Sequence, residues 1–107
     1  HLADPAYPAD ELPRDIQPLG NTGVCDGMLY DGDGRILLAD PERHAIMRYL
    51  PAGAGGKLQT VIQSDQLQWP DTFSVGPDGA LYVSISQIDT QPHPPGPYKL
   101  FKVLPKR

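Results

Sequence analysis

The sequence predicts an all-β protein built from repeated antiparallel strand units, and three observations support that fold class. Short apolar stretches recur along the chain, and its 13 prolines and 11 glycines fall largely between them, as expected for turns. No segment has a convincing helical period, because the best candidate, residues 41–49, is short and ends in β-forming residues. The third observation is an internal repeat, in which residues 26–39 align with residues 71–84 at an offset of 45.

The elements of the first repeat follow from turn chemistry and apolar patterning. Residues 1–23 are poor in apolar side chains and rich in proline, so they predict an extended lead-in with one short strand near Ile16 to Leu19. Met28 and Tyr30 alternate in a strand that ends at Asp31-Gly32-Asp33-Gly34, a sequence suited to a tight hairpin. Further strands are predicted over residues 36–39, 46–50 and 58–62, with a polar connection at 40–44 and a turn at 51–56.

The second repeat preserves the key positions of the first. Aligned residues are identical at Asp26/Asp71, Asp33/Asp78 and Gly34/Gly79, and five further pairs are apolar in both copies. A nine-residue insertion, DTQPHPPGP, then precedes LFKVLP (100–105), which matches IMRYLP (46–51). Four short strands repeating about every 45 residues are typical of the blades of a β-propeller, each blade a four-stranded antiparallel meander.

The chain therefore reads as one partial β-propeller domain spanning residues 1–107. Residues 24–64 form one blade, residues 65–107 a second, incomplete blade, and residues 1–23 a lead-in that includes an outer strand of a preceding blade. Propellers close with roughly four to eight blades, so two blades leave apolar faces uncovered. We expect either a fragment of a longer protein or a subunit that closes a ring with copies of itself.

Composition and charge exclude some classes of partner. The net charge is −4 and no basic stripe is present, which argues against a nucleic-acid ligand. No apolar run approaches the roughly 18 residues needed to span a bilayer, and no signal peptide is visible. Cys25 is the single cysteine, so no internal disulfide can form.

Two stretches resemble known families. LQWPDTFSVGPDGALYVSIS (67–86), followed by YKLFKV (98–103), resembles the closing region of the Yellow / major royal jelly protein family in a bacterial-type version. DGMLYDGDGRILLAD (26–40) is similar to strand pairs of the senescence marker protein / gluconolactonase propellers. The resemblance covers residues 16–105. It implies a six-bladed propeller whose last two blades are this chain, and a periplasmic or secreted location. Ser86-Gln87 replaces the Asn-Arg pair of many insect members, some of which convert dopachrome.

The predicted topology gathers polar groups at one end of the blades. In an antiparallel meander, the start of the first strand, the end of the second and the start of the third share one end. Asp26 and Asp71 begin the innermost strands beside the central channel, and the connections at 40–44 and 87–97 lie at the same end. We therefore expect a small-molecule site at this mouth, with Asp71, Trp69, Gln87 and His93 as ligand-binding residues beside Asp26.

Asp26 is also the candidate catalytic residue and metal ligand, on the strength of the resemblance. In gluconolactonase-like proteins, the aspartate of the segment that matches Asp26-Gly27-Met28 binds a divalent cation and takes part in proton transfer. Carboxylates suit Ca²⁺, Mg²⁺ or Mn²⁺. The other ligands of that family belong to blades outside this chain.

Simpler interpretations stand beside these. An aspartate before a strand often accepts hydrogen bonds from its own backbone amides, which would explain Asp26 and Asp71 without a ligand. Trp69 could be wedged between blades, and His93 could be a plain loop residue. Three functions stay open: a small-molecule-binding propeller or Yellow-like isomerase, a metal-dependent lactonase-like hydrolase using Asp26, and a scaffold that binds another protein through its Pro-rich loop.

Overall fold

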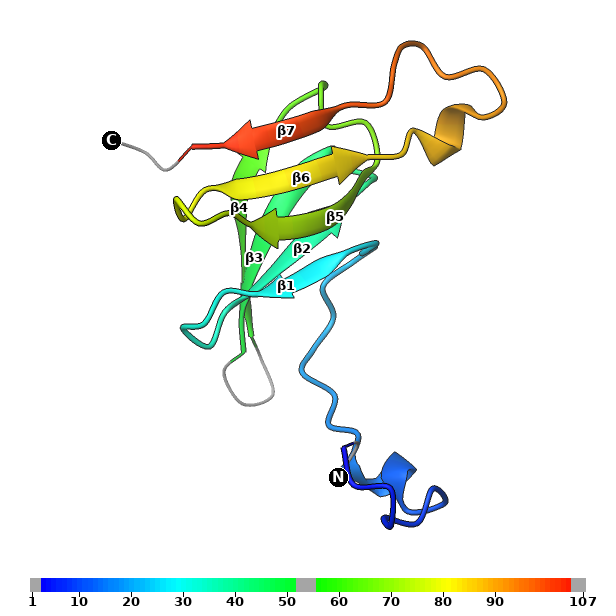
Figure 1. Ribbon diagram of the computed structural model, residues 1–107, viewed down its shortest axis with the longest axis vertical. Coiled ribbons are helices and arrows are strands. Elements are labelled where there is room, and N and C mark those ends of the chain that lie inside the picture. The colour runs from blue at the N-terminus through cyan, green and yellow to red at the C-terminus, as the bar shows by residue number, and fades with distance from the viewer. Residues whose placement is uncertain (1–2, 52–55, 105–107) are drawn as a thin grey trace.

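The computed structural model describes residues 3–51 and 56–104, which form two antiparallel sheets and almost no helix (Figure 1). The first sheet has the order β1-β2-β3-β4 and the second has the order β5-β6-β7. The strands are β1 (Met28–Tyr30), β2 (Ile36–Asp40), β3 (Ala45–Leu50), β4 (Lys57–Gln63), β5 (Pro70–Val75), β6 (Leu81–Ile85) and β7 (Leu100–Val103). The prediction of an all-β chain is confirmed. The two sheets do not close into a ring within the described residues.

The tight turn between β1 and β2 is held by the aspartate at its first position. Asp31 Oδ1 accepts hydrogen bonds from the backbone amides of Asp33 and Arg35, at 3.0 and 3.3 Å. Gly32 and Gly34 supply φ values of +90° and +77°, which residues with a side chain rarely adopt. In the second sheet Asp78 plays a similar part, since its carboxylate accepts the amide of Ala80 at 3.1 Å.

The lead-in differs from its prediction. It contains a short 3₁₀ helix, η1 (Leu12–Asp15), and the described residues near Ile16 to Leu19 form no strand. Pro18 lacks the N–H that a ladder would need at that point, and Ile16 is 74% exposed. The segment instead runs along the first sheet, where the Leu19 carbonyl accepts a hydrogen bond from the Tyr49 hydroxyl.

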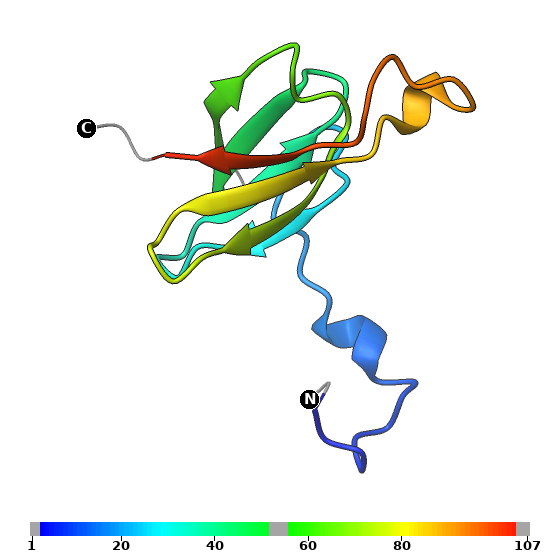
Figure 2. The ribbon, with the colours of Figure 1, turned by 45° about the horizontal axis from the view of Figure 1, so that its top comes forward.

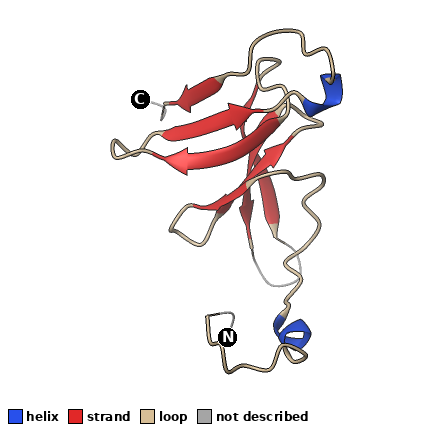
Figure 3. Ribbon diagram, turned by 45° about the vertical axis from the view of Figure 1, so that its right-hand side comes forward, coloured by secondary structure: helices blue, strands red, loops and turns tan. Residues whose placement is uncertain are grey.

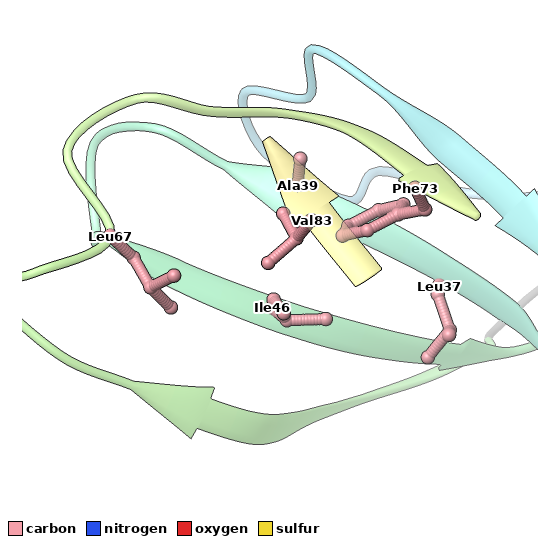
Figure 4. Close-up of a cluster of buried hydrophobic side chains, with 6 residues drawn as sticks. All are labelled: Leu37, Ala39, Ile46, Leu67, Phe73 and Val83. Carbon is pink, nitrogen blue, oxygen red and sulfur yellow. The ribbon is translucent and has the colours of Figure 1, made fainter. Parts of the chain in front are cut away.

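The main core lies between the two sheets (Figure 4). It consists of Leu37, Ala39, Ile46, Leu67, Phe73 and Val83. Ile46 and Val83 are completely buried, and full burial of such a side chain contributes about 1.5–3 kcal/mol. A second cluster, Leu38, Ala45, Met47 and Tyr49, lies on the other face of the first sheet.

The sheets meet most closely at their first strands, since β5 contacts both β1 and β2 (Figure 2). Because the strands alternate in direction, the turns at residues 31–35 and 76–80 lie at one end of the molecule. The connections 40–45, 63–70 and 85–100 lie at the opposite end, together with the start of β1. We call this second end the connection end.

Candidate functional site

At the connection end, Asp26 of the first sheet and Trp69 of the second are joined directly. The indole Nε1–H of Trp69 donates to Asp26 Oδ2 at 2.6 Å. Asp26 is fixed by backbone pairing, since its amide donates to the Ala39 carbonyl at 3.1 Å. The two residues are 43 positions apart in the chain. Their contact therefore depends on the way the two sheets pack.

The backbone of Trp69 is held in an unusual conformation. Its φ is +55°, in the left-handed region, which is rare for a bulky residue and costs on the order of 1–3 kcal/mol. The Trp69 carbonyl accepts the Ser86 amide at 3.0 Å, which anchors this conformation although Pro70, at the start of β5, favours an extended residue before it. This conformation directs the indole to the first sheet. The Asp26 carboxylate fixes its position.

Asp71 lies beside this pair through its backbone. Gly27 packs so closely against the Asp71 carbonyl oxygen that a methyl group at Gly27 would overlap it. The Asp71 carboxylate accepts a hydrogen bond from the Thr72 hydroxyl at 3.0 Å. The sheets thus place Asp26, Trp69 and Asp71 together, and we call these three residues the inner-edge site.

Neither aspartate forms the simple turn that would explain it without a ligand. Among the hydrogen bonds of the described residues, no backbone amide donates to the carboxylate of Asp26 or Asp71. Asp26 is exposed and its Oδ1 has no partner within that part of the chain. The inner-edge site therefore presents carboxylate oxygens that remain available to an incoming donor.

One carboxylate at this end of the molecule is buried and already paired. Asp40, at the end of β2, is 1% exposed and accepts the Arg43 amide at 2.9 Å as well as the Arg43 guanidinium. The half-buried Cys25 precedes Asp26 in the chain and feels the charges of both carboxylates. Burial raises the pKa of the Cys25 thiol, and the negative charges of Asp26 and Asp40 add to that rise.

Gln87 lies buried at the base of the Pro-rich loop and holds it in place. Its side chain is 1% exposed, and its Nε2 donates to the carbonyls of Gly96 and Pro97, both at 3.2 Å. The Gln87 carbonyl accepts hydrogen bonds from the Thr90 amide and hydroxyl, at 3.1 and 2.8 Å. Gln87 therefore clamps both ends of the Pro-rich loop, which carries the short helix η2 (Ile88–Thr90) and projects beyond the strands (Figure 3).

The clamped loop closes one side of a small cavity of about 240 Å³. Its wall includes Gln87, Pro95 and Lys99 from the loop side, and Asp65 and Gln68 from the connection between β4 and β5. His93 is exposed on the loop and does not line this cavity. No hydrogen bond or ion pair of the described residues joins His93 to Asp26 or Asp71. The loop and the inner-edge site thus share one end of the molecule without a direct polar contact.

The described residues do not make up a divalent metal site. Ca²⁺ takes six to eight oxygen ligands and Mg²⁺ six. Within residues 3–51 and 56–104, no three His, Cys, Asp or Glu side chains are grouped so that they could hold a metal ion. Asp26 Oδ2 is already engaged by Trp69, and Asp40 is engaged by Arg43. We therefore derive no reaction step through a metal.

Comparison of the chain with protein-family models, curated proteins and solved structures gives no match in any of the three. The described residues also contain no helix with the length and hydrophobicity required to cross a membrane.

Two features of the site escaped the sequence reasoning. Gly27 allows close packing against Asp71 of the other sheet, so the local pattern Asp26-Gly27-Met28 could not predict its role. The clamp at Gln87 depends on an insertion that the first repeat lacks, and the repeat therefore offers no template for it. The one signal available was the Pro-rich composition of residues 92–97, which indicates a stiff loop needing an anchor.

Proposed function

We propose that this chain forms two adjacent blades of a β-propeller of the Yellow / major royal jelly type and binds a small polar molecule at the inner-edge site. Two consecutive antiparallel meanders, packed face to face with their first strands in contact, support the blade assignment. The repeat that relates residues 26–39 to 71–84 supports it independently. The family assignment rests on the resemblance of residues 67–86 and 98–103 to the Yellow / major royal jelly proteins.

One observation carries the ligand-binding part of the proposal. The backbone of Trp69 has a costly conformation, and its indole donates a hydrogen bond to the exposed Asp26 carboxylate at the junction of the two sheets. Strain of this kind concentrates at functional sites. A molecule with N–H or O–H donors, or with a positive charge, would find the free Asp26 oxygen and the Asp71 carboxylate, with an aromatic ring beside them. Such a combination of polar groups with an aromatic surface is typical of small-molecule sites.

A protein-binding role for the Pro-rich loop remains the second candidate, because exposed apolar side chains lie at its two ends. Ile88 is 52% exposed and Tyr98 is 61% exposed. Both flank the segment held by Gln87. The metal-dependent lactonase-like activity rests on the resemblance at Asp26 alone, and it would need ligands from outside the described residues.

Trp69 offers a direct test, because it is the single tryptophan and gives one indole N–H resonance. We expect a ligand at the inner-edge site to shift that resonance and saturate it. The test is a ¹H–¹⁵N titration with a fragment set of amines, polyols and lactones, and separately with Ca²⁺. The Asp26→Asn variant keeps the shape of the acceptor but removes its charge, so the response to charged or strongly donating fragments should weaken at least tenfold.

The possible outcomes separate the candidates. A saturable shift with a fragment, lost in Asp26→Asn, supports the small-molecule proposal. A shift with Ca²⁺ alone favours the metal-dependent alternative. If nothing in the set moves the Trp69 resonance of the unmodified chain, the inner-edge site is not a ligand site and the proposal is wrong.

A further inference from the structure

The second sheet ends in a strand whose outer edge has no partner. β7 pairs with β6 on one side, and no other described strand lies beside it (Figure 1). The Lys99 carbonyl accepts the Ile85 amide at 3.2 Å, which sets the alternation along β7. The main-chain groups of Phe101 and Val103 therefore point to β6, while those of Leu100 and Lys102 point to the open edge. An open edge of this kind is a template for another strand.

The first sheet shows what normally occupies that position. The strand that corresponds to β7 is β3, because IMRYLP (46–51) matches LFKVLP (100–105). β3 is covered by β4 along its whole length, from the pair Ala45/Gln63 to the pair Leu50/Lys57. By the same repeat, the place beside β7 fits an extended strand of about the length of β4, antiparallel to β7.

A groove lies where that strand would rest. It has a volume of about 810 Å³ and runs between β4 and β7. Leu37, Val61, Leu81 and Val103 give it an apolar lining, to which apolar side chains at alternate positions of a strand could pack. Leu104, also in the lining, is 67% exposed, as expected where cover is missing.

One polar group in this groove indicates the chemistry of the occupant. Arg48 lines the groove, and its Nε is buried with no hydrogen-bond partner in the described residues. Leaving such a donor unpaired is costly, and a carboxylate would satisfy it. The sequence of β7 and its flanks has the same preference, because residues 98–104 contain Lys99 and Lys102 but no acidic residue, and Lys102 is paired with Asp78 on the second sheet. Both features favour an acidic strand and disfavour pairing with a second copy of the basic β7.

We propose that the open edge of β7 binds an extended peptide strand, antiparallel to β7, that carries apolar side chains at alternate positions and an Asp or Glu directed at Arg48. Main-chain hydrogen bonds to Leu100 and Lys102 hold such a strand, and the groove selects its side chains. The inference does not depend on a ligand at Asp26, which lies at the inner edge of the sheets.

The probe is a heptapeptide with the sequence of Lys57–Gln63, the strand that fills the equivalent place in the first sheet, carrying Thr60→Glu. The matched control carries Thr60→Lys instead. With the 107-residue chain, we expect the acidic peptide to bind about tenfold more tightly than the basic one, because a hydrogen bond to a charged partner is worth that much. Arg48→Gln should abolish the difference. Amide hydrogen exchange measured by NMR should show new protection at Leu100 and Lys102.

Two controls distinguish strand addition from simple hydrophobic contact. N-methyl groups at alternate residues of the acidic peptide should block binding in one register and leave it unchanged in the other, because only every second amide faces β7. Leu100→Pro removes an outward N–H without loss of a bond to β6, and should abolish binding while circular dichroism shows the sheet intact.

Several results would overturn the proposal. Equal binding of both N-methylated peptides, or protection at β1 or β4 in place of β7, excludes strand addition at this edge. Equal affinity for the Glu and Lys peptides excludes Arg48 as the selecting group. If the unmodified chain sediments as a dimer and Leu100→Pro as a monomer, a second copy occupies the edge and the peptide assignment is wrong.

Discussion

The hydrogen bond from Trp69 to Asp26 is placed by interactions on both sides of the sheet junction. The Asp26 amide donates a hydrogen bond to the Ala39 carbonyl, and the Trp69 carbonyl accepts one from the Ser86 amide. The aspartates were predictable, since they recur at an offset of 45 in a pattern of turns and apolar residues. The partner of Asp26 was not, because the Asx-turn bonds that local sequence favours are replaced by the indole of Trp69, which sheet packing brings from 43 positions away. Asp71 bonds instead to the hydroxyl of its neighbour Thr72.

The reactivity of the Cys25 thiol measures the electrostatic effect of the nearby Asp26 carboxylate. Burial raises the pKa of its thiol, and the charges of Asp26 and Asp40 contribute in the same direction. A raised pKa means less thiolate at a given pH, so alkylation by iodoacetamide near pH 8 should be slower than for free cysteine. Asp26→Asn removes one of the negative charges, lowers the thiol pKa and should speed the reaction.

The control for Cys25 is Asp78→Asn, a change of the same kind at the opposite end of the sheets. It should leave the alkylation rate unaltered, and denaturant should make all three proteins react at the rate of free cysteine. A rate that falls in Asp26→Asn would show that the carboxylate does not act on the thiol as described.

At the scale of elements, turn chemistry explains why the strand bounds were predictable to within about a residue. Asp31 and the glycines after it determine where β1 ends and β2 begins, whatever the sheets pack against. The strand predicted in the lead-in is absent, because it depended on a neighbouring strand and not on local turns. Ile16 to Leu19 has strand-like composition, but a strand exists only if a neighbour supplies its ladder, and no such neighbour is present among the described residues.

Gly27 tests the closest approach of the two sheets. A side chain there would overlap the Asp71 carbonyl oxygen, which belongs to backbone and cannot swing aside. We expect Gly27→Ala to lower the free energy of unfolding by about 1–3 kcal/mol, as overpacking of a core does. Urea denaturation followed by circular dichroism measures the change.

Gly96→Ala is the matched control for Gly27, because no atom lies within 4 Å of the position its methyl group would take. Its urea midpoint should equal or slightly exceed that of the unmodified chain, since alanine reduces the entropy of the unfolded state. Equal midpoints for the two variants would mean that β1 and β5 are not in the close contact described.

For the whole molecule, the two sheets differ in what they leave uncovered. On the outer face of the first sheet, Met28 and Tyr30 of β1 are 67% and 63% exposed. The outer face of the second sheet is more polar, because Ser74, Ser84 and Lys102 lie on it beside Tyr82 and the 69% exposed Leu100. The repeat predicted two similar blades and so could not reveal this asymmetry, which depends on single substitutions between aligned positions.

Self-association of the chain should therefore take place through the face that carries Met28 and Tyr30. Repeat units of this kind generally need about three copies to bury a continuous core, so we expect the 107-residue chain to associate as its concentration rises. Replacing both residues by glutamine removes exposed apolar surface from that face and should shift sedimentation velocity profiles to the monomer. Ile88→Gln, on the Pro-rich loop and also half-exposed, is the control and should leave association unchanged. A chain that stays monomeric at every concentration and unfolds cooperatively only at high temperature would show that two sheets suffice, and the need for further blades or further copies would fall away.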